Sequence, residues 1–152
     1  MTIEYVDAIA EMTSIVETWW DANAATTAGL TYTPEIRKMG IEYRETPDHS
    51  KYWGYISFVT ASDNQATLTG PDFVRLYETK GLFYLQIFGP RSKGDSFYNC
   101  QLLAHNVKKL FRKNSTNDSI WFKNPRVQEM KPEPSWNNIN VIVEYSYQES
   151  EG

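Results

Sequence analysis

The segment from Phe73 to Phe111 constrains the fold more than any other part of the chain. It reads FVRLYETKGLFYLQIFGPRSKGDSFYNCQLLAHNVKKLF. Residues 73–78 and 82–88 are rich in aromatic and branched side chains, which favour strands. Gly81 suits the left-handed position of a short hairpin loop between them. The segment therefore predicts an antiparallel hairpin, and because both of its faces are largely apolar, both need cover.

An amphipathic helix is predicted directly after this hairpin. Gly89 and Pro90 end the second strand, and Asp95 or Ser96 can cap the helix. Apolar residues then recur at steps of three and four, which is the pattern of a helix with one buried stripe. The stripe consists of Cys100, Leu103, Ala104, Val107, Leu110 and Phe111. We expect Leu103 and Val107 to meet Phe83, Leu85 or Ile87 in one core.

A second helix is predicted at the start of the chain, over residues 3–23, with Thr2 as its cap. Small residues after position 21 break the period. The apolar side chains form an unusually wide arc. One row holds Val6, Ile9, Ala10, Thr13, Val16 and Trp20, and a neighbouring row holds Met12, Ile15 and Trp19. Either the helix is deeply buried or part of the arc contacts a partner.

Three further strands complete the predicted fold. Residues 52–60 are aromatic and β-branched, and residues 139–147 alternate between apolar and polar side chains. Residues 120–128 form a strand interrupted at Pro125, which favours a sheet edge or a bulge. Residues 61–71 are polar and predict a connection. The expected fold class is α+β, a largely antiparallel sheet with two main helices packed on it.

Length and charge limit the possible classes of protein. The chain has 152 residues, a formal net charge of −4 and a pI near 5.2. Residues 1–152 are expected to form a single domain. The acidic balance argues against specific nucleic-acid recognition, because phosphate binding needs a clustered excess of Lys and Arg. No signal sequence or membrane-length apolar run is apparent, so we expect a soluble, intracellular protein.

The sequence contains no catalytic or metal-binding constellation that we recognise. Residues 89–96 have the spacing of a phosphate-binding loop, but Asp95 stands where that motif needs lysine. His49 and His105 lack a second ligand at metal-binding spacing. Cys100 lies on the apolar stripe and is expected to be a buried small hydrophobe rather than a nucleophile. We therefore expect no enzymatic activity, no cofactor and no metal.

The order of elements resembles the tail terminator-like family of long-tailed bacteriophages, which includes the lambda-type tail terminator. The resemblance spans nearly the whole chain. It rests on a hydrophobic first helix with Trp19 and Trp20, and on Gly81 before an apolar strand that is followed by Pro90 and Gly94. It also rests on a closing segment, WNNINVIVEY, that begins at Trp136. None of these features is a catalytic signature.

The resemblance implies a structural virion protein with a specific place in tail assembly. Such a protein forms a homo-hexameric ring on the head-proximal end of the tail tube, stops tail polymerisation and provides the surface for head–tail joining. Its partners would be the tail tube protein and the head completion or connector protein, and it would be assembled in the bacterial cytoplasm. Two alternatives remain: another ring of the virion neck, or a monomeric binding or inhibitory module.

A closed ring requires two different, complementary surfaces on each copy. Arg75 would lie opposite Leu85 in the predicted hairpin, so it must reach water or meet a carboxylate at an interface. Charged residues in the predicted loops near Glu78 and Arg91 are further candidates. The predicted subunit or tail interface comprises Arg75, Leu76, Glu78, Lys80, Tyr84, Arg91 and Lys93.

Overall fold

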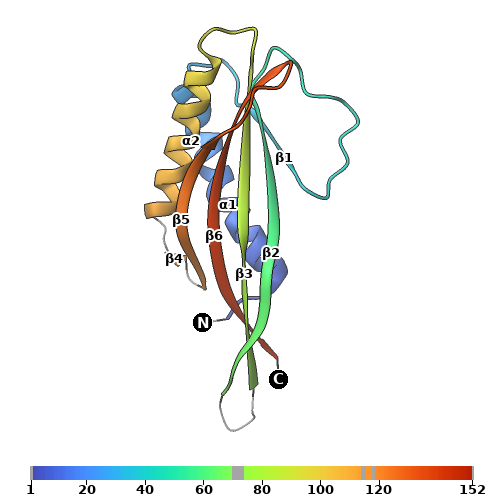
Figure 1. Ribbon diagram of the computed structural model, residues 1–152, viewed down its shortest axis with the longest axis vertical. Coiled ribbons are helices and arrows are strands. Elements are labelled where there is room, and N and C mark those ends of the chain that lie inside the picture. The colour runs from blue at the N-terminus through green and yellow to red at the C-terminus, as the bar shows by residue number, and fades with distance from the viewer. Residues whose placement is uncertain (1, 70–73, 114–115, 118, 152) are drawn as a thin grey trace.

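A six-stranded sheet with two helices on one face forms the protein (Figure 1). The computed structural model describes residues 2–69, 74–113, 116–117 and 119–151, with side chains of strand residues 66–69, 74–75, 116–117 and 150–151 left out. The elements are α1 (Tyr5–Ala28), β1 (Glu35–Lys38), β2 (Trp53–Thr69), β3 (Val74–Pro90), α2 (Ser96–Lys113), β4 (Thr116–Asn117), β5 (Ile120–Glu129) and β6 (Trp136–Glu151). The predicted α+β class is confirmed.

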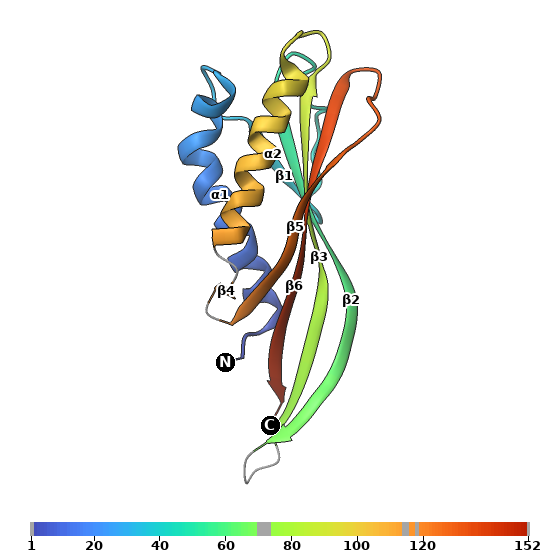
Figure 2. The same ribbon diagram turned by 60° about the vertical axis from the view of Figure 1, so that its left-hand side comes forward.

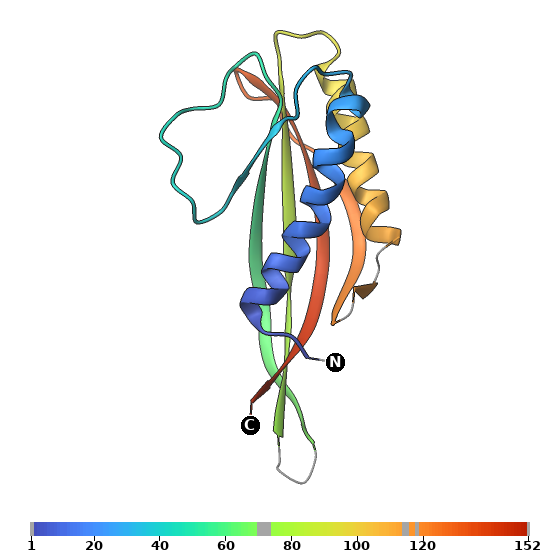
Figure 3. The same cartoon turned by 180° about the vertical axis from the view of Figure 1, so that it is seen from behind.

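The sheet runs in the order β1-β2-β3-β6-β5-β4, and β1 is parallel to β2 while the other pairs are antiparallel. Viewed from the side, both helices lie in one layer against one face of the sheet (Figure 2). Seen from behind, α1 crosses in front of the strands, and its first turns lie toward the end of the molecule that also holds both chain termini (Figure 3). The opposite face carries no helix in the part of the chain that the structure describes.

Helix α2 confirms the predicted stripe except at Leu110, which is only partly buried. Cys100, Leu103 and Val107 are fully buried, and they belong to one core cluster with strand residues Phe83, Leu85 and Ile87. The predicted packing of the helix on these strand residues is therefore confirmed. Arg112 and Lys113 occupy the last turn, where a helix favours cations.

Helix α1 is longer than predicted and buries a different row. Its N-cap is Glu4 rather than Thr2, without a side-chain capping bond, and it ends at Gly29 in the left-handed conformation. The buried row follows strict steps of four: Ala8, Met12, Val16, Trp20, Ala24 and Ala28. Val16 and Trp20 of the predicted first row and Met12 of the second are buried, but the first row was wrong at Val6, which is 73% exposed, and at Ala10, which is also exposed. Small residues at the C-terminal end extend the buried row instead of ending the helix.

The predicted hairpin at Gly81 is wrong, because β3 is one continuous strand of 17 residues. Gly81 pairs with Thr60 on one side and Tyr145 on the other, and Arg75 pairs with Leu68 and Glu151 instead of Leu85. A Cβ atom at Gly81 would collide with the Tyr145 hydroxyl and the Val59 carbonyl. Glycine is therefore needed for the close approach of neighbouring groups rather than for a turn. Phe73, the predicted start of the hairpin, lies outside the described residues.

Strand β2 is likewise longer than predicted, because the strand at 52–60 continues through most of the supposed polar connection to Thr69. Residues 70–71 of that connection lie outside the described residues. Two register shifts, between Thr60 and Ser62 and between Gln65 and Thr67, interrupt its pairing with β3. β2 and β3 thus form a long ribbon that extends beyond the helices (Figure 3).

Strand β5 matches its prediction to within one residue, and β6 contains the predicted strand 139–147 but is longer at both ends. β6 buries Ile139, Val141, Val143, Tyr145 and Tyr147. The pairing of β5 with β6 shifts register between Lys123 and Arg126, around Pro125, and Asn124 adopts a positive φ of 50°. This is the predicted bulge. Since β4 pairs only with Ile120 and Trp121, most of β5 is also a sheet edge.

Candidate interaction surface

The sheet face opposite the helices, called the open face below, is the main candidate for a functional surface. The strand register identifies its residues, because side chains in adjacent strands share a face when their positions are paired. It comprises Trp53, Tyr55, Ser57 and Val59 of β2, Leu76, Glu78, Lys80, Leu82, Tyr84, Gln86 and Phe88 of β3, Asn138, Asn140, Ile142, Glu144 and Ser146 of β6, and Trp121, Lys123, Arg126 and Gln128 of β5.

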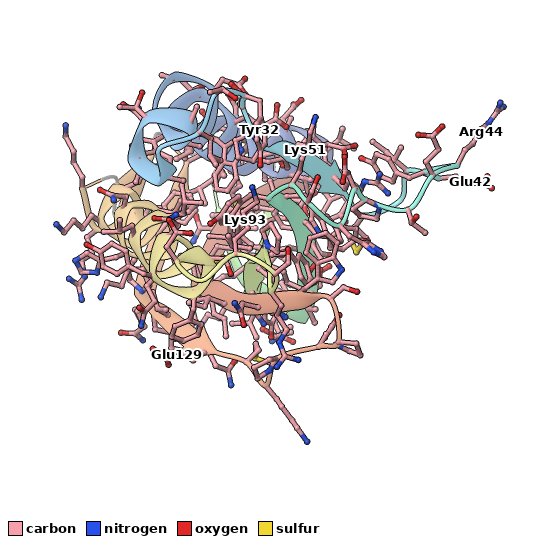
Figure 4. The ribbon with its side chains drawn as sticks, turned by 90° about the horizontal axis from the view of Figure 1, so that it is seen from above. Tyr32, Glu42, Arg44, Lys51, Lys93 and Glu129 are labelled. Atoms are coloured by element: carbon pink, nitrogen blue, oxygen red, sulfur yellow. The ribbon has the colours of Figure 1, made fainter. Side chains whose placement is uncertain are left out.

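Aromatic rings gather at one end of the open face. Trp53 stacks on Phe88 with ring centroids 4.2 Å apart, and Trp136 meets Trp53 edge-on at 5.9 Å. Arg37 of β1 places its guanidinium 5.7 Å from the Trp53 ring, and His49 contacts Trp136 from the loop between β1 and β2. This loop swings away from the body, and its Glu42 and Arg44 point outward (Figure 4). It covers only this end of the face.

Amide side chains cross the middle of the open face. Gln86, Asn140 and Gln128 occupy paired positions on β3, β6 and β5. Asn138 and Asn140 are more than nine-tenths buried, and the side-chain oxygen of each has no hydrogen-bond partner among the described residues. An unsatisfied buried polar group costs about 1–3 kcal/mol. The open face therefore contains polar groups that a purely structural core would avoid.

A groove of about 520 Å³ lies at the other end of the open face. We call it the basic groove. It is lined by Ala61, Ser62, Lys80, Gly81, Leu82, Trp121, Lys123, Arg126, Glu144, Tyr145 and Ser146. Its three cations, Lys80, Lys123 and Arg126, outnumber its single carboxylate, Glu144, which pairs with Arg126 at 3.2 Å. Lys80 also pairs with Glu78, beside the groove on β3, at 3.2 Å. Trp121 is 42% exposed and Val59, beside the groove, is 50% exposed. The groove thus combines positive charge with accessible apolar surface.

A second cavity, of about 360 Å³, lies beside β1 and the loop after it. Arg37 and Lys51 line it together with Asp48, whose pKa is lowered mainly by a hydrogen bond from the Ser50 hydroxyl. Tyr52 also lines it, and burial raises the pKa of this phenol despite the hydrogen bond from Asn99. These charges largely neutralise one another. The cavity offers no paired nucleophile and base.

The residues considered for chemistry are not brought together. Cys100 is enclosed in the core, where burial raises the pKa of its thiol to about 12. His105 lies exposed on α2, where desolvation and the nearby Lys108, Lys109 and Arg112 lower its pKa. Among the described residues, no group of three His, Cys, Asp or Glu side chains could hold a metal ion. No helix in the described part of the chain is long and apolar enough to cross a membrane.

The predicted interface residues divide between the two ends of the molecule. Leu76, Glu78, Lys80 and Tyr84 occupy alternate positions of β3, so they lie on the open face with Leu82. Glu78 and Lys80 are strand residues joined by a 3.2 Å ion pair, not loop residues as predicted. Arg75 has a described backbone position in β3, and its side chain lies outside the described set.

Arg91 and Lys93 lie beyond the far end of β3, in the turn before α2. Lys93 is labelled in Figure 4. The Arg91 guanidinium donates to the Glu133 carbonyl at 3.0 Å and so ties this turn to the loop before β6. The two groups of predicted residues therefore do not form one surface. Sequence reasoning missed Trp121, Lys123 and Arg126, because Ile120, Trp121 and Phe122 are all apolar and only the strand register shows that Trp121 lies on the open face.

Comparison with known proteins bears on the fold alone. No protein-family model matches the chain, and no curated protein matches it. Matches exist among solved structures, and one is a protein named only by its sequence identifier. The two structures agree with a TM-score of 0.53 over 89% of this chain and 94% of the other, at 11% sequence identity. At such low identity the likeness indicates a shared arrangement of elements and no shared activity.

Proposed function

We propose that this protein is a structural subunit of a bacteriophage tail, a tail terminator that forms a ring on the head-proximal end of the tail tube. In this role it ends tail polymerisation and offers the surface to which the head attaches. The observation that carries the proposal is the asymmetry of the sheet. Helices cover one face, and the other face presents aromatic, amide and basic side chains.

This asymmetry suits a subunit of a closed ring. Neighbours related by rotation contact each other through two different surfaces, so each copy needs two unlike faces. The open face has the composition of a contact surface, with Trp and Tyr side chains beside Asn and Gln. The ribbon formed by β2 and β3 adds reach beyond the helix layer (Figure 1). A subunit that contacts both neighbours and the tube needs such an extension.

The sequence features behind the resemblance have clear structural roles. Trp20 is buried, and its indole N–H donates to the Pro34 carbonyl at 2.9 Å, which ties α1 to the segment before β1. Trp136 belongs to the aromatic cluster on the open face. Gly81 allows β3 to pass between β2 and β6. These roles support a common architecture with the tail terminator-like family, as the proposal requires.

Deletion of the gene from the phage genome that encodes it tests the proposal. We expect tails that grow beyond their normal length and do not join heads, as seen by negative-stain electron microscopy. Tails of normal length that fail to join heads would favour the alternative neck ring. Normal, head-joined tails would refute both virion roles.

Complementation of the deletion connects the phenotype to the open face. We expect wild-type protein to restore tail length, and Tyr84→Glu to fail because it places a charge on the contact surface. Gln101→Glu introduces the same charge at an exposed position of α2 and is the matched control. Equal complementation by the two variants would remove the open face from the proposed role. Circular dichroism melting of both purified variants excludes loss of folding as the cause.

A further inference from the structure

Helix α1 carries a surface that is complementary to the basic groove. The helix contains Asp7, Glu11, Glu17 and Asp21 and no lysine or arginine. Only Glu17 forms an ion pair within the described residues, with Lys38 of β1. Tyr5 and Val6, at its first turn, are 47% and 73% exposed. The first turns thus combine free carboxylates with accessible apolar side chains, which mirrors the cations and apolar side chains of the groove.

The two surfaces lie at the same level of the molecule on opposite faces of the sheet. The segment before α1 is fixed to β6 by a hydrogen bond from the Ile3 amide to the Gln148 carbonyl, 2.9 Å long. Ser146, two residues earlier on β6, lines the groove on the other face. Complementary surfaces at equal height allow neighbours to be related by rotation with little translation. That relation closes a ring, whereas an added translation would produce an open filament.

We propose that the first turns of α1 in one copy dock into the basic groove of the next copy. Asp7 and Glu11 then face Lys80 and Lys123, and Val6 contacts the Trp121 side of the groove. The second copy supplies the cover that this part of the open face lacks within one chain. The inference rests on the proposed ring, and it names the contact by which the ring forms.

The cationic end of α2 is the competing site for the same carboxylates. Lys108, Lys109, Arg112 and Lys113 form a row there, and α2 contains no carboxylate. Exposed large apolar side chains on α2 lie at its other end, at Phe97 and Tyr98. Binding energy at interfaces comes mainly from apolar and aromatic anchors rather than from exposed charges. The basic groove, which holds both, is therefore the better partner.

Charge reversal in purified protein tests the contact. We expect the wild-type weight-average mass to rise with concentration in sedimentation equilibrium. Lys80→Glu/Lys123→Glu and Asp7→Lys/Glu11→Lys should each weaken association by about tenfold or more, and their combination should restore it. Lys109→Glu/Arg112→Glu makes the same change of charge on α2 and should associate like wild type. If only this control loses association, the docking site is α2 and the proposal is wrong.

Disulfide trapping tests the geometry directly. Val6→Cys and Ser146→Cys place thiols on the two surfaces, since Ser146 lines the groove and pairs with Trp121 across β6 and β5, and buried Cys100 does not compete. Under mild oxidation at high protein concentration, the double variant should give a ladder of covalent oligomers. Each single variant should remain monomeric, because the contact joins unlike surfaces. Failure of the double variant to form any cross-link overturns the proposal.

These results separate the contact from the proposed role in the tail. Association through α1 and the groove, together with normal tails in the deletion phage, would keep the contact and refute the terminator. Overlong tails without cross-links would keep the terminator and refute this contact.

Discussion

The two faces of the central sheet carry different sets of side chains. The covered face holds Phe83, Leu85, Ile87, Val141 and Val143, all fully buried beneath the helices. The open face, one residue out of phase along the same strands, holds Trp, Tyr, Asn, Gln, Lys and Arg side chains. Both faces are formed by the same strands, so they differ only in their side chains and in the groups that these side chains contact. The covered face forms the main core, and the open face is itself buried around Phe88, Asn140 and Ile142 but exposes Val59 and Trp121.

Truncation on the covered face should have the largest effect. Leu103→Ala removes a fully buried side chain of α2 that faces the sheet. Such changes typically cost about 2–5 kcal/mol because they leave a cavity. We expect a clear drop in the thermal midpoint, measured by circular dichroism. Tyr84→Ala, on the open face, is the comparison and should shift the midpoint less. Equal midpoints for Leu103→Ala and wild type would contradict the assigned core.

Gly81→Ala tests whether β3 runs as one continuous strand between β2 and β6. The added methyl group would meet the Tyr145 hydroxyl and the Val59 carbonyl, and overpacking of this kind typically costs about 1–3 kcal/mol. Gly94→Ala is the control, since a Cβ atom there meets nothing within 4 Å. We expect a lower urea midpoint for Gly81→Ala than for Gly94→Ala. A stabilised Gly81→Ala variant would show that β3 does not pass as closely as described.

Asn140→Leu should change the stability of the protein least among these substitutions. The direction of the change distinguishes the open face from the covered face. The substitution replaces a buried amide, whose oxygen has no partner among the described residues, by an apolar side chain of similar size. Removing an unsatisfied polar group in this way is nearly neutral or stabilising. We expect the urea midpoint to stay equal or rise, while Val141→Asn on the covered face lowers it. A marked loss of stability in Asn140→Leu would mean that this amide is satisfied in the monomer.

Local pattern was sufficient for much of the fold. The steps of three and four in α2, the alternation in β6 and the break at Pro125 each predicted an element that the structure confirms. These patterns succeed because one face of each element must be apolar, and the repeat of the helix or strand places the side chains. The predicted interface stays a prediction. Of its residues Lys80 lines the basic groove, and the prediction did not name Trp121, Lys123 or Arg126 on the β5 side of the groove.

The sequence by itself determined most of the residues of α2 and β6 that enter the core, because their periodicity is a local property. Only the tertiary structure decided how far β2 and β3 run and which row of α1 is buried. Gly81 allows both a turn and a close passage, and the choice depends on Tyr145, far along the chain and adjacent only after folding. Val6 and Met12 are equally apolar, and the position of α2 and the sheet decides which of them is covered.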